Sequence, residues 1–270
     1  MFFRDTIVAG KTIIRTLKAT SRINNTGTQK RKPKSNPTSE AVRKINFRNA
    51  VKILTAKLNH NFKPGDYHLV LTYARPLAPE EARRCLERFL NNLRGYCKRN
   101  DIDFKWVAVT EYEHSRIHHH IVMSEIDLEE ISKRWKYGYI KPVLLDKSGN
   151  YYRLAEYLLK ETEKTFRNDD SPQKRRYSCS RSVVMPEVKR EKVAGREVYQ
   201  DIKTPKGYSV DEDTVRKYEH AILRVECMEY IMVCDDESCR LKRWKRGRAV
   251  TVRGLYKDFE KQMSFDDLDI

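Results

Sequence analysis

The segment from Trp106 to Met123, WVAVTEYEHSRIHHHIVM, constrains the fold of this chain more than any other part of the sequence. An apolar run ends in acidic residues, a short polar stretch follows, and a second apolar run carries three consecutive histidines. This pattern predicts two neighbouring β-strands. Because side chains alternate across a strand, His118 and His120 are expected on one face and His119 on the other.

The two histidines that share a face supply most of a divalent-metal site, because their backbones lie about 7 Å apart and their side chains point the same way. Glu111 ends the first apolar run and is the expected carboxylate ligand, with Glu113 or His114 as substitutes. Such a site leaves coordination positions open for a substrate oxygen. The alternative is an accidental histidine cluster. Ile117 and 121–123 instead indicate a buried strand, and the whole chain has only seven histidines.

The charge balance indicates a polyanionic partner. The chain has 270 residues, with 55 Lys and Arg against 38 Asp and Glu, and its net charge is +17. A field of this sign attracts polyanions, so nucleic acid is the first candidate, and a membrane surface or a ribosomal location is the alternative. No apolar run approaches the roughly 20 residues that span a bilayer, and the first residues do not resemble a secretory signal. We therefore expect a cytoplasmic protein.

Changes in composition divide the chain into three regions. Residues 1–60 are strongly basic and are expected to form an N-terminal arm, a polar linker and a helix. The arm either follows a phosphate backbone or only makes the chain more soluble. Residues 61–185 are expected to form the catalytic domain, and residues 186–270 an accessory region of short strands and charged helices.

Residues 62–163 alternate between strand and helix patterns in the order strand, helix, strand, strand, helix, strand, helix. The first helix begins at Pro79 and is amphipathic through Lys98, so Cys85 and Cys97 on its apolar face are expected to be core residues. This order predicts an α+β fold with a central, mainly antiparallel sheet and helices packed on it. A basic N-terminal arm and a small C-terminal region are expected in addition.

A second chemical pattern lies in the last predicted helix, at 151–163, where Tyr157 and Lys160 are one turn apart and face the same way. A tyrosine hydroxyl ionises near pH 10, so it becomes a useful nucleophile when a cation or a metal stabilises the phenolate. Taken alone, the helix favours the ordinary alternative, a core tyrosine whose hydroxyl reaches the surface.

Three motifs in combination resemble a known family. LVLTY (Leu69–Tyr73), RIHHHIV (Arg116–Val122) and EYLLK (Glu156–Lys160) have the order and spacing found in rolling-circle replication initiators. These proteins belong to the HUH endonucleases, a superfamily named for its His–hydrophobe–His strand. The resemblance spans roughly residues 40–185 and is greatest to the initiators of phages, plasmids and integrative elements.

The resemblance implies a site-specific, metal-dependent DNA nickase on a ferredoxin-like or RRM-like fold. It assigns His118, His120 and Glu111 to a Mg²⁺ or Mn²⁺ ion. Tyr157 would form a 5′-phosphotyrosine and free a 3′-hydroxyl, and Lys160 would assist at the scissile phosphate.

The implied partners are single-stranded origin DNA and, during replication, a host helicase and polymerase in a bacterial cytoplasm. The cleaved strand would later be rejoined. The alternatives are a relaxase or tyrosine transposase of the same superfamily, or a non-catalytic nucleic-acid-binding protein on an RRM-like sheet.

Two positions depart from the family pattern. His119 is polar where the family usually has a bulky apolar residue, and we expect it to be buried or to contact DNA. Arg153, not a second tyrosine, stands one turn before Tyr157. Tyr151 and Tyr152 are out of helical register with Tyr157, so a paired-tyrosine mechanism is not expected. Termination would then need a second subunit, water or another nucleophile.

Further DNA contacts are expected outside the metal site. The first motif contributes Thr72 and Tyr73, whose role in the family is structural or in DNA contact. Residues 242–248 interleave an aromatic side chain with cations, which suits backbone contact and base stacking or else a solvated basic face. The expected DNA-binding residues are Thr72, Tyr73, Arg153, Arg175, Arg176, Lys242, Arg243, Trp244 and Lys245. The last residues, QMSFDDLDI, faintly resemble a peptide that docks on a sliding clamp.

Overall fold

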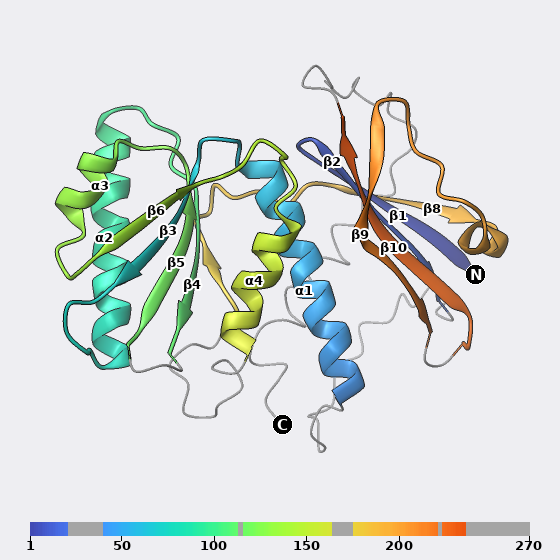
Figure 1. Ribbon diagram of the computed structural model, residues 1–270, viewed down its shortest axis with the longest axis horizontal. Helices are drawn as coiled ribbons and strands as arrows, with labels where there is room; N and C mark the ends of the chain where they lie inside the picture. The colour runs from blue at the N-terminus through green and yellow to red at the C-terminus, as the bar shows by residue number, and fades with distance from the viewer. Residues whose placement is uncertain (21–39, 113–115, 164–174, 221–222, 236–270) are drawn as a thin grey trace, which may run out of the picture.

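The computed structural model describes residues 1–20, 40–112, 116–163, 175–220 and 223–235, and these form two five-stranded antiparallel sheets with helices between and beside them (Figure 1). In chain order the elements are β1 (Phe2–Ala9), β2 (Thr12–Ala19), α1 (Glu40–Asn61), β3 (Tyr67–Thr72), α2 (Pro79–Arg99), β4 (Trp106–Glu111), β5 (His118–Met123), α3 (Leu128–Arg134), β6 (Ile140–Leu144), α4 (Tyr152–Glu163), β7 (Ser178–Cys179), β8 (Val188–Val193), the 3₁₀ helix η2 (Gly195–Tyr199), β9 (Tyr208–Glu219) and β10 (Glu226–Cys234).

The histidine strand lies at the centre of one sheet, with strand order β6-β3-β5-β4-β7, which we call the histidine sheet. The order of elements from β3 to α4 is the one expected from the sequence, and the predicted α+β class is confirmed. β5 pairs with β3 on one side and with β4 on the other, and both pairings are antiparallel. A central position makes β5 rigid, because both edges of its backbone are hydrogen-bonded to neighbours.

One face of the histidine sheet, the core face, packs against α2 and α3 (Figure 1). Helix α2 begins at Pro79, has two acidic residues in its first turn and two basic residues in its last, and therefore complements the helix dipole at both ends. Its buried residues include Phe89, Cys85 and Cys97, so both cysteines are core residues as predicted.

The opposite face packs against α1 and α4 over part of its length, and we call it the site face. Val107, Val109 and Val122 of the sheet contact buried residues of both helices, among them Leu58 and Leu158. The apolar contacts therefore fasten α4 to the same face that carries His118 and His120, and leave the polar end of this face for chemistry.

The second sheet, which we call the terminal sheet, has strand order β8-β1-β2-β10-β9 and joins the two ends of the described chain. The expected N-terminal arm is therefore wrong for residues 1–20, which form a β-hairpin paired with β8 and β10. Gly10 in its turn has φ of 55°, and an added Cβ there would lie 2.1 Å from the Asn59 carbonyl oxygen. The predicted boundary between residues 1–60 and the C-terminal region also does not match this pairing. The linker at 24–39 lies outside the described residues.

The charges of the hairpin are used within the protein. Arg4 pairs with Glu191 at 2.8 Å, and the carboxylate of Asp5 pairs with Lys18 at 2.7 Å and with Arg190 at 2.6 Å. Asp5 is buried, and its cationic neighbours lower the pKa of its carboxyl although burial alone would raise it. These cations therefore stabilise the terminal sheet and are not arranged along a phosphate backbone.

Helices α1 and α4 lie between the two sheets (Figure 1). Asn59 of α1 ties the three parts together, because its side chain donates to the Thr12 hydroxyl at 2.9 Å and accepts from the backbone N–H of Tyr151 at 2.8 Å. All three polar groups are buried, so breaking either hydrogen bond would leave an unpaired polar group in the interior. Within the described residues, no helix is both long and apolar enough to cross a membrane.

Candidate active site

The strand register separates the three histidines as the sequence predicted. His118 lies between Thr72 of β3 and Glu111 of β4, and His120 lies between Val70 and Val109. Side chains at positions directly opposite each other share one face of a sheet. His118, His120, Thr72 and Glu111 therefore all belong to the site face, and His119 belongs to the core face.

His119 is a buried core residue with no exposed surface. Its Nε2 lies 2.7 Å from the Tyr73 hydroxyl, and its Nδ1 lies 2.9 Å from the Thr110 hydroxyl. Because the Tyr73 hydroxyl donates to the Ala82 carbonyl oxygen at 3.0 Å, Nε2 carries the proton and Nδ1 accepts. Burial lowers the pKa of His119 to about 3, so the ring is neutral. Of the two expectations for His119, burial is the one the structure supports.

His120 sits where the sheet meets α4. Its ring is perpendicular to that of Tyr157, with the centroids 5.5 Å apart, and its Nε2 lies 3.9 Å from a carboxylate oxygen of Glu111. Both His120 and Glu111 are buried, at 4% and 7% exposure. Burial lowers the pKa of His120 to about 4, so near pH 7 it is a neutral imidazole with a lone pair to offer.

His68 of β3 is a site residue that the sequence patterns did not predict. Its ring stacks on His120 with centroids 5.5 Å apart, and its Nε2 lies 3.3 Å from Nδ1 of His120. Burial lowers the pKa of His68 to about 4 as well. Counting back from Thr72 by twos places His68 on the site face, but its approach to His120 depends on the cross-strand register, which the sequence does not state.

The donors on the site face fit a divalent metal in chemistry, since they are neutral imidazoles and a carboxylate. The 3.9 Å between the His120 nitrogen and the Glu111 oxygen is too long for a hydrogen bond, and both atoms can lie about 2.1 Å from one ion. Within the part of the chain that is described, no group of three or more His, Cys, Asp and Glu side chains is arranged to hold a metal. His120 and Glu111 therefore form a prepared pair, and His118 neighbours it without completing it. Glu113 and His114, the substitutes, lie outside the described residues.

Helix α4 presents Tyr157 at the surface, 43% exposed, against the edge of His120. This is not the fully packed tyrosine that an ordinary apolar helix face would contain. Lys160 is also exposed, and its Nζ lies 3.5 Å from an oxygen of Glu156. The helix therefore holds a phenol and an ammonium group beside the histidines, with the ammonium near a carboxylate of its own helix.

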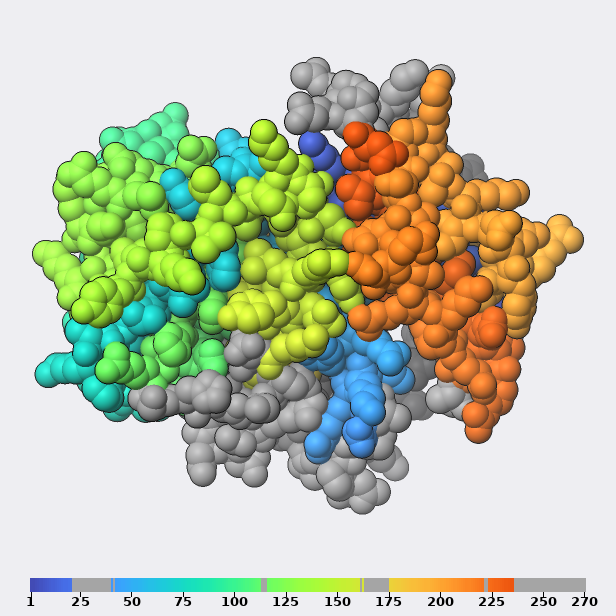
Figure 2. Space-filling view, viewed as in Figure 1, coloured from blue at the N-terminus to red at the C-terminus, as the bar shows by residue number. Residues whose placement is uncertain are grey.

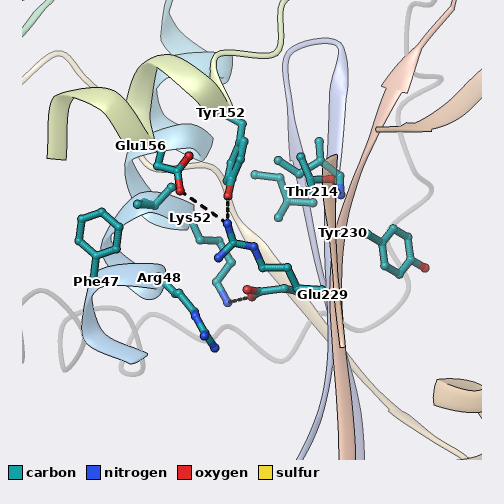
Figure 3. A pocket seen from close by; sticks show the side chains of 12 residues that line it. Phe47, Arg48, Lys52, Tyr152, Glu156, Thr214, Glu229 and Tyr230 are labelled. Carbon is teal, nitrogen blue, oxygen red and sulfur yellow. Dashed lines mark hydrogen bonds and ion pairs between the residues drawn. The ribbon is translucent and has the colours of Figure 1, made fainter. Parts of the chain in front are cut away.

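The neighbouring tyrosines of α4 are structural. Tyr151 is buried, and burial raises the pKa of its hydroxyl. Tyr152 accepts a hydrogen bond from Arg216 of β9, and Arg216 is also 3.6 Å from Glu156 (Figure 3). Lys52 of α1 pairs with Glu229 of β10 across the same small pocket. These contacts fasten the tyrosine helix to the terminal sheet and leave Tyr157 as the tyrosine on the site face of α4.

The expected DNA-binding residues have different environments. Thr72 is partly exposed on the site face, whereas Tyr73 is 2% exposed on the core face and is wrongly placed for DNA contact. Arg176 is buried with its guanidinium 5.6 Å from the ring centre of Phe47, so it too is wrong as a surface contact. Arg153 is exposed and pairs with Asp213, and Arg175 is exposed. Lys242, Arg243, Trp244, Lys245 and the clamp-like tail lie outside the described residues.

The comparison with family models connects this geometry to replication. Residues 66–166 match the family described as replication-associated protein ORF2. The match includes β3 to α4, and so the histidine strand, His68 and Tyr157. Comparison with the curated proteins and comparison with the solved structures each gave no match. The family match confirms the resemblance to rolling-circle replication initiators, and the segment at 66–166 is a replication-associated protein domain of the ORF2 family.

Proposed function

We propose that this protein initiates rolling-circle replication by nicking single-stranded origin DNA with Tyr157. The observation that carries the proposal is the contact between the Tyr157 ring and the His120 ring, 5.5 Å between centroids. It joins the histidine strand and the tyrosine helix, which are separated in sequence, at one exposed position. The match of residues 66–166 to a replication-associated family supports the same interpretation.

In the proposed reaction, the phenolate oxygen of Tyr157 attacks a backbone phosphorus atom and forms a new O–P bond. The bond from that phosphorus to the 3′-oxygen of the preceding nucleotide breaks, and the 3′-oxygen takes a proton from solvent. The phenol proton leaves to water. The products are a 5′-phosphotyrosine and a free 3′-hydroxyl, and because the phosphoester bond energy is kept, the reverse attack rejoins the strand without ATP.

We assign His118, His120 and Glu111 as the metal ligands, because they share the site face and His120 and Glu111 already lie side by side. A bound Mg²⁺ or Mn²⁺ would polarise the scissile phosphate and stabilise charge that develops on its oxygens. The burial of His120 keeps its imidazole neutral near pH 7, and neutral imidazole is the form that binds metals.

We assign Lys160 to charge stabilisation at the phosphate or phenolate. It is exposed one turn beyond Tyr157, so its flexible side chain can reach a substrate lying over α4. Its contact with Glu156 is an exposed ion pair, and such pairs are worth only about 0–1 kcal/mol. A phosphate therefore competes with Glu156 for Lys160 at small cost.

The non-catalytic alternative treats all three histidines as structural. His119 fits that description, since both its ring nitrogens are hydrogen-bonded in the core. His120 does not, because it lies against an exposed tyrosine and a buried carboxylate. This contrast favours the nickase.

A covalent-adduct assay tests the proposal. The protein is incubated with labelled single-stranded DNA and Mn²⁺ or Mg²⁺, and the expected product is a protein–DNA adduct that survives denaturing electrophoresis. Tyr157→Phe removes only the hydroxyl and should abolish the adduct. Tyr139→Phe is a matched control, since Tyr139 is 74% exposed and its variant should still form the adduct. Adduct formation by Tyr157→Phe at the parent rate would overturn the assignment of the nucleophile.

A further inference from the structure

An open cavity of about 430 Å³ lies next to the site, at the junction of β6, the 146–150 turn, α4 and the terminal sheet. Its volume is within the range of about 300–1,000 Å³ typical of small-molecule sites. Figure 2 shows the two parts of the molecule meeting on this side, along α4 and β9. One wall is His68, which stacks on His120, and His120 in turn contacts Tyr157. Two ring-to-ring steps of 5.5 Å thus separate the cavity from the proposed nucleophile.

The walls of this cavity suit a flat aromatic group. Val143 is the cross-strand neighbour of His68 on β6, and Leu154 of α4 and Val233 of β10 add apolar surface. Val143 is 45% exposed although it is a large apolar residue on an edge strand. A neutral imidazole and aliphatic side chains together make a surface on which a base can lie without hydrogen-bonding penalties.

The polar groups at the rim are acceptors. Asp146 uses one carboxylate oxygen for the N–H and hydroxyl of Ser148, and Asp211 uses one for the Asn150 side-chain amide at 2.7 Å. For the other oxygen of each carboxylate, no hydrogen bond is found among the described residues. Two carboxylates at the rim repel a phosphate, and their open oxygens can accept hydrogen bonds from amino groups.

We propose that this cavity binds one base of the single-stranded substrate, close to the scissile phosphate, and selects bases that carry an exocyclic amino group. Cytosine, adenine and guanine offer such a donor, and thymine does not. The terminal sheet contributes Asp211, so it takes part in choosing the cleavage site. This inference rests on the proposed nicking function and adds to it a base subsite.

The test uses the full chain and a single-stranded DNA library with a randomised segment. Covalent adducts are isolated and their DNA is sequenced, which gives the base preference at each position around the cut. The parent should disfavour thymine by about tenfold at one position within two nucleotides of the cut. Asp211→Asn replaces an acceptor by an amide and should relax this preference at that position alone. Glu212→Gln, a neighbouring exposed carboxylate on β9 that does not line the cavity, should leave it unchanged.

A second variant covers the case in which Asp211→Asn is poorly folded. Val143→Trp fills the cavity from the exposed edge strand, where a larger side chain is tolerated, and should reduce adduct yield about tenfold. If the parent forms adducts but neither variant changes base preference or yield, the base subsite is overturned while the nicking function stands. If the parent forms no adduct with any member of the library, the proposed function itself fails.

Discussion

The two faces of the histidine sheet use neighbouring residues of one strand for opposite purposes. On the core face, His119 is enclosed by Tyr73, Thr110 and Trp135 and both its ring nitrogens have partners. On the site face, His120 is similarly protected from water but lies against Glu111 and an exposed Tyr157. Both imidazoles are neutral because burial lowers their pKa.

Burial and neutrality therefore do not distinguish a structural histidine from a functional one. What differs is whether the ring nitrogens have hydrogen-bond partners that fully occupy them. Those of His119 are occupied by two hydroxyl groups, whereas Nε2 of His120 faces a carboxylate that is too distant for a hydrogen bond. The first arrangement stabilises a core, and the second can accept a metal.

The largest expected effect separates the two faces by activity. His120→Ala should reduce adduct formation by about a thousandfold, because several kcal/mol of charge stabilisation at the phosphate would be lost. His119→Phe should keep adduct formation within about threefold of the parent, since an apolar residue is usual at this position in the family. Initial rates at saturating Mn²⁺ measure both. Equal losses in two folded variants would contradict the comparison.

Acid should destabilise the protein through the buried histidines. Their folded-state pKa values, about 3 for His119 and about 4 for His68 and His120, lie below the ordinary value of 6.5. As the pH falls below 6.5, the unfolded chain binds protons that the folded chain does not. Each histidine then costs up to about 1.4 kcal/mol of stability per pH unit until its folded pKa is reached. Urea unfolding between pH 7.5 and 4.5 measures the slope, and a flat profile would contradict neutral burial.

His119→Phe sharpens this assignment. At pH 7.5 the variant should lose about 1–3 kcal/mol of unfolding free energy, because the buried Thr110 hydroxyl loses its partner. Between pH 6.5 and 4 its stability should fall less steeply than that of the parent, because one of the three buried histidines is gone. The same urea titrations give both values, and an unchanged acid slope would argue against the burial of His119.

The smallest effect concerns the link between the terminal sheet and the tyrosine helix. Arg216→Met removes the hydrogen bond to Tyr152 and the ion pair with Glu156. Because Arg216 and Glu156 are partly exposed, the variant should lose about 1 kcal/mol or less. Adduct formation should slow by about twofold to threefold if Arg216 acts through Glu156, and the effect should shrink in a Glu156→Gln background. Additive effects of the two substitutions would indicate that they act independently.

Much of the histidine sheet could be predicted from local sequence. The alternation in WVAVTE and HHHIVM, the capping pattern of the helix from Pro79, and the helical spacing of 151–163 each depend on neighbouring residues. The faces of His118, His119 and His120 follow from the two-residue period of a strand. The N-terminal hairpin was missed because its strands are completed by β8 and β10, which lie far away in the chain. Its cations suggest a DNA-binding arm when taken alone, although Arg4 and Lys18 pair with carboxylates of the same sheet.

By itself, the sequence determined that two histidines face one way and the third faces the other, because side-chain alternation is a property of every β-strand. It also determined that Tyr157 and Lys160 share a helix face. The tertiary structure decided the rest: that His68 stacks on His120, that Tyr73 is buried beneath α2, and that Tyr157 meets the histidine strand while its helix is held by the terminal sheet. Those contacts depend on strand register and on helix packing between distant segments, and no local pattern encodes them.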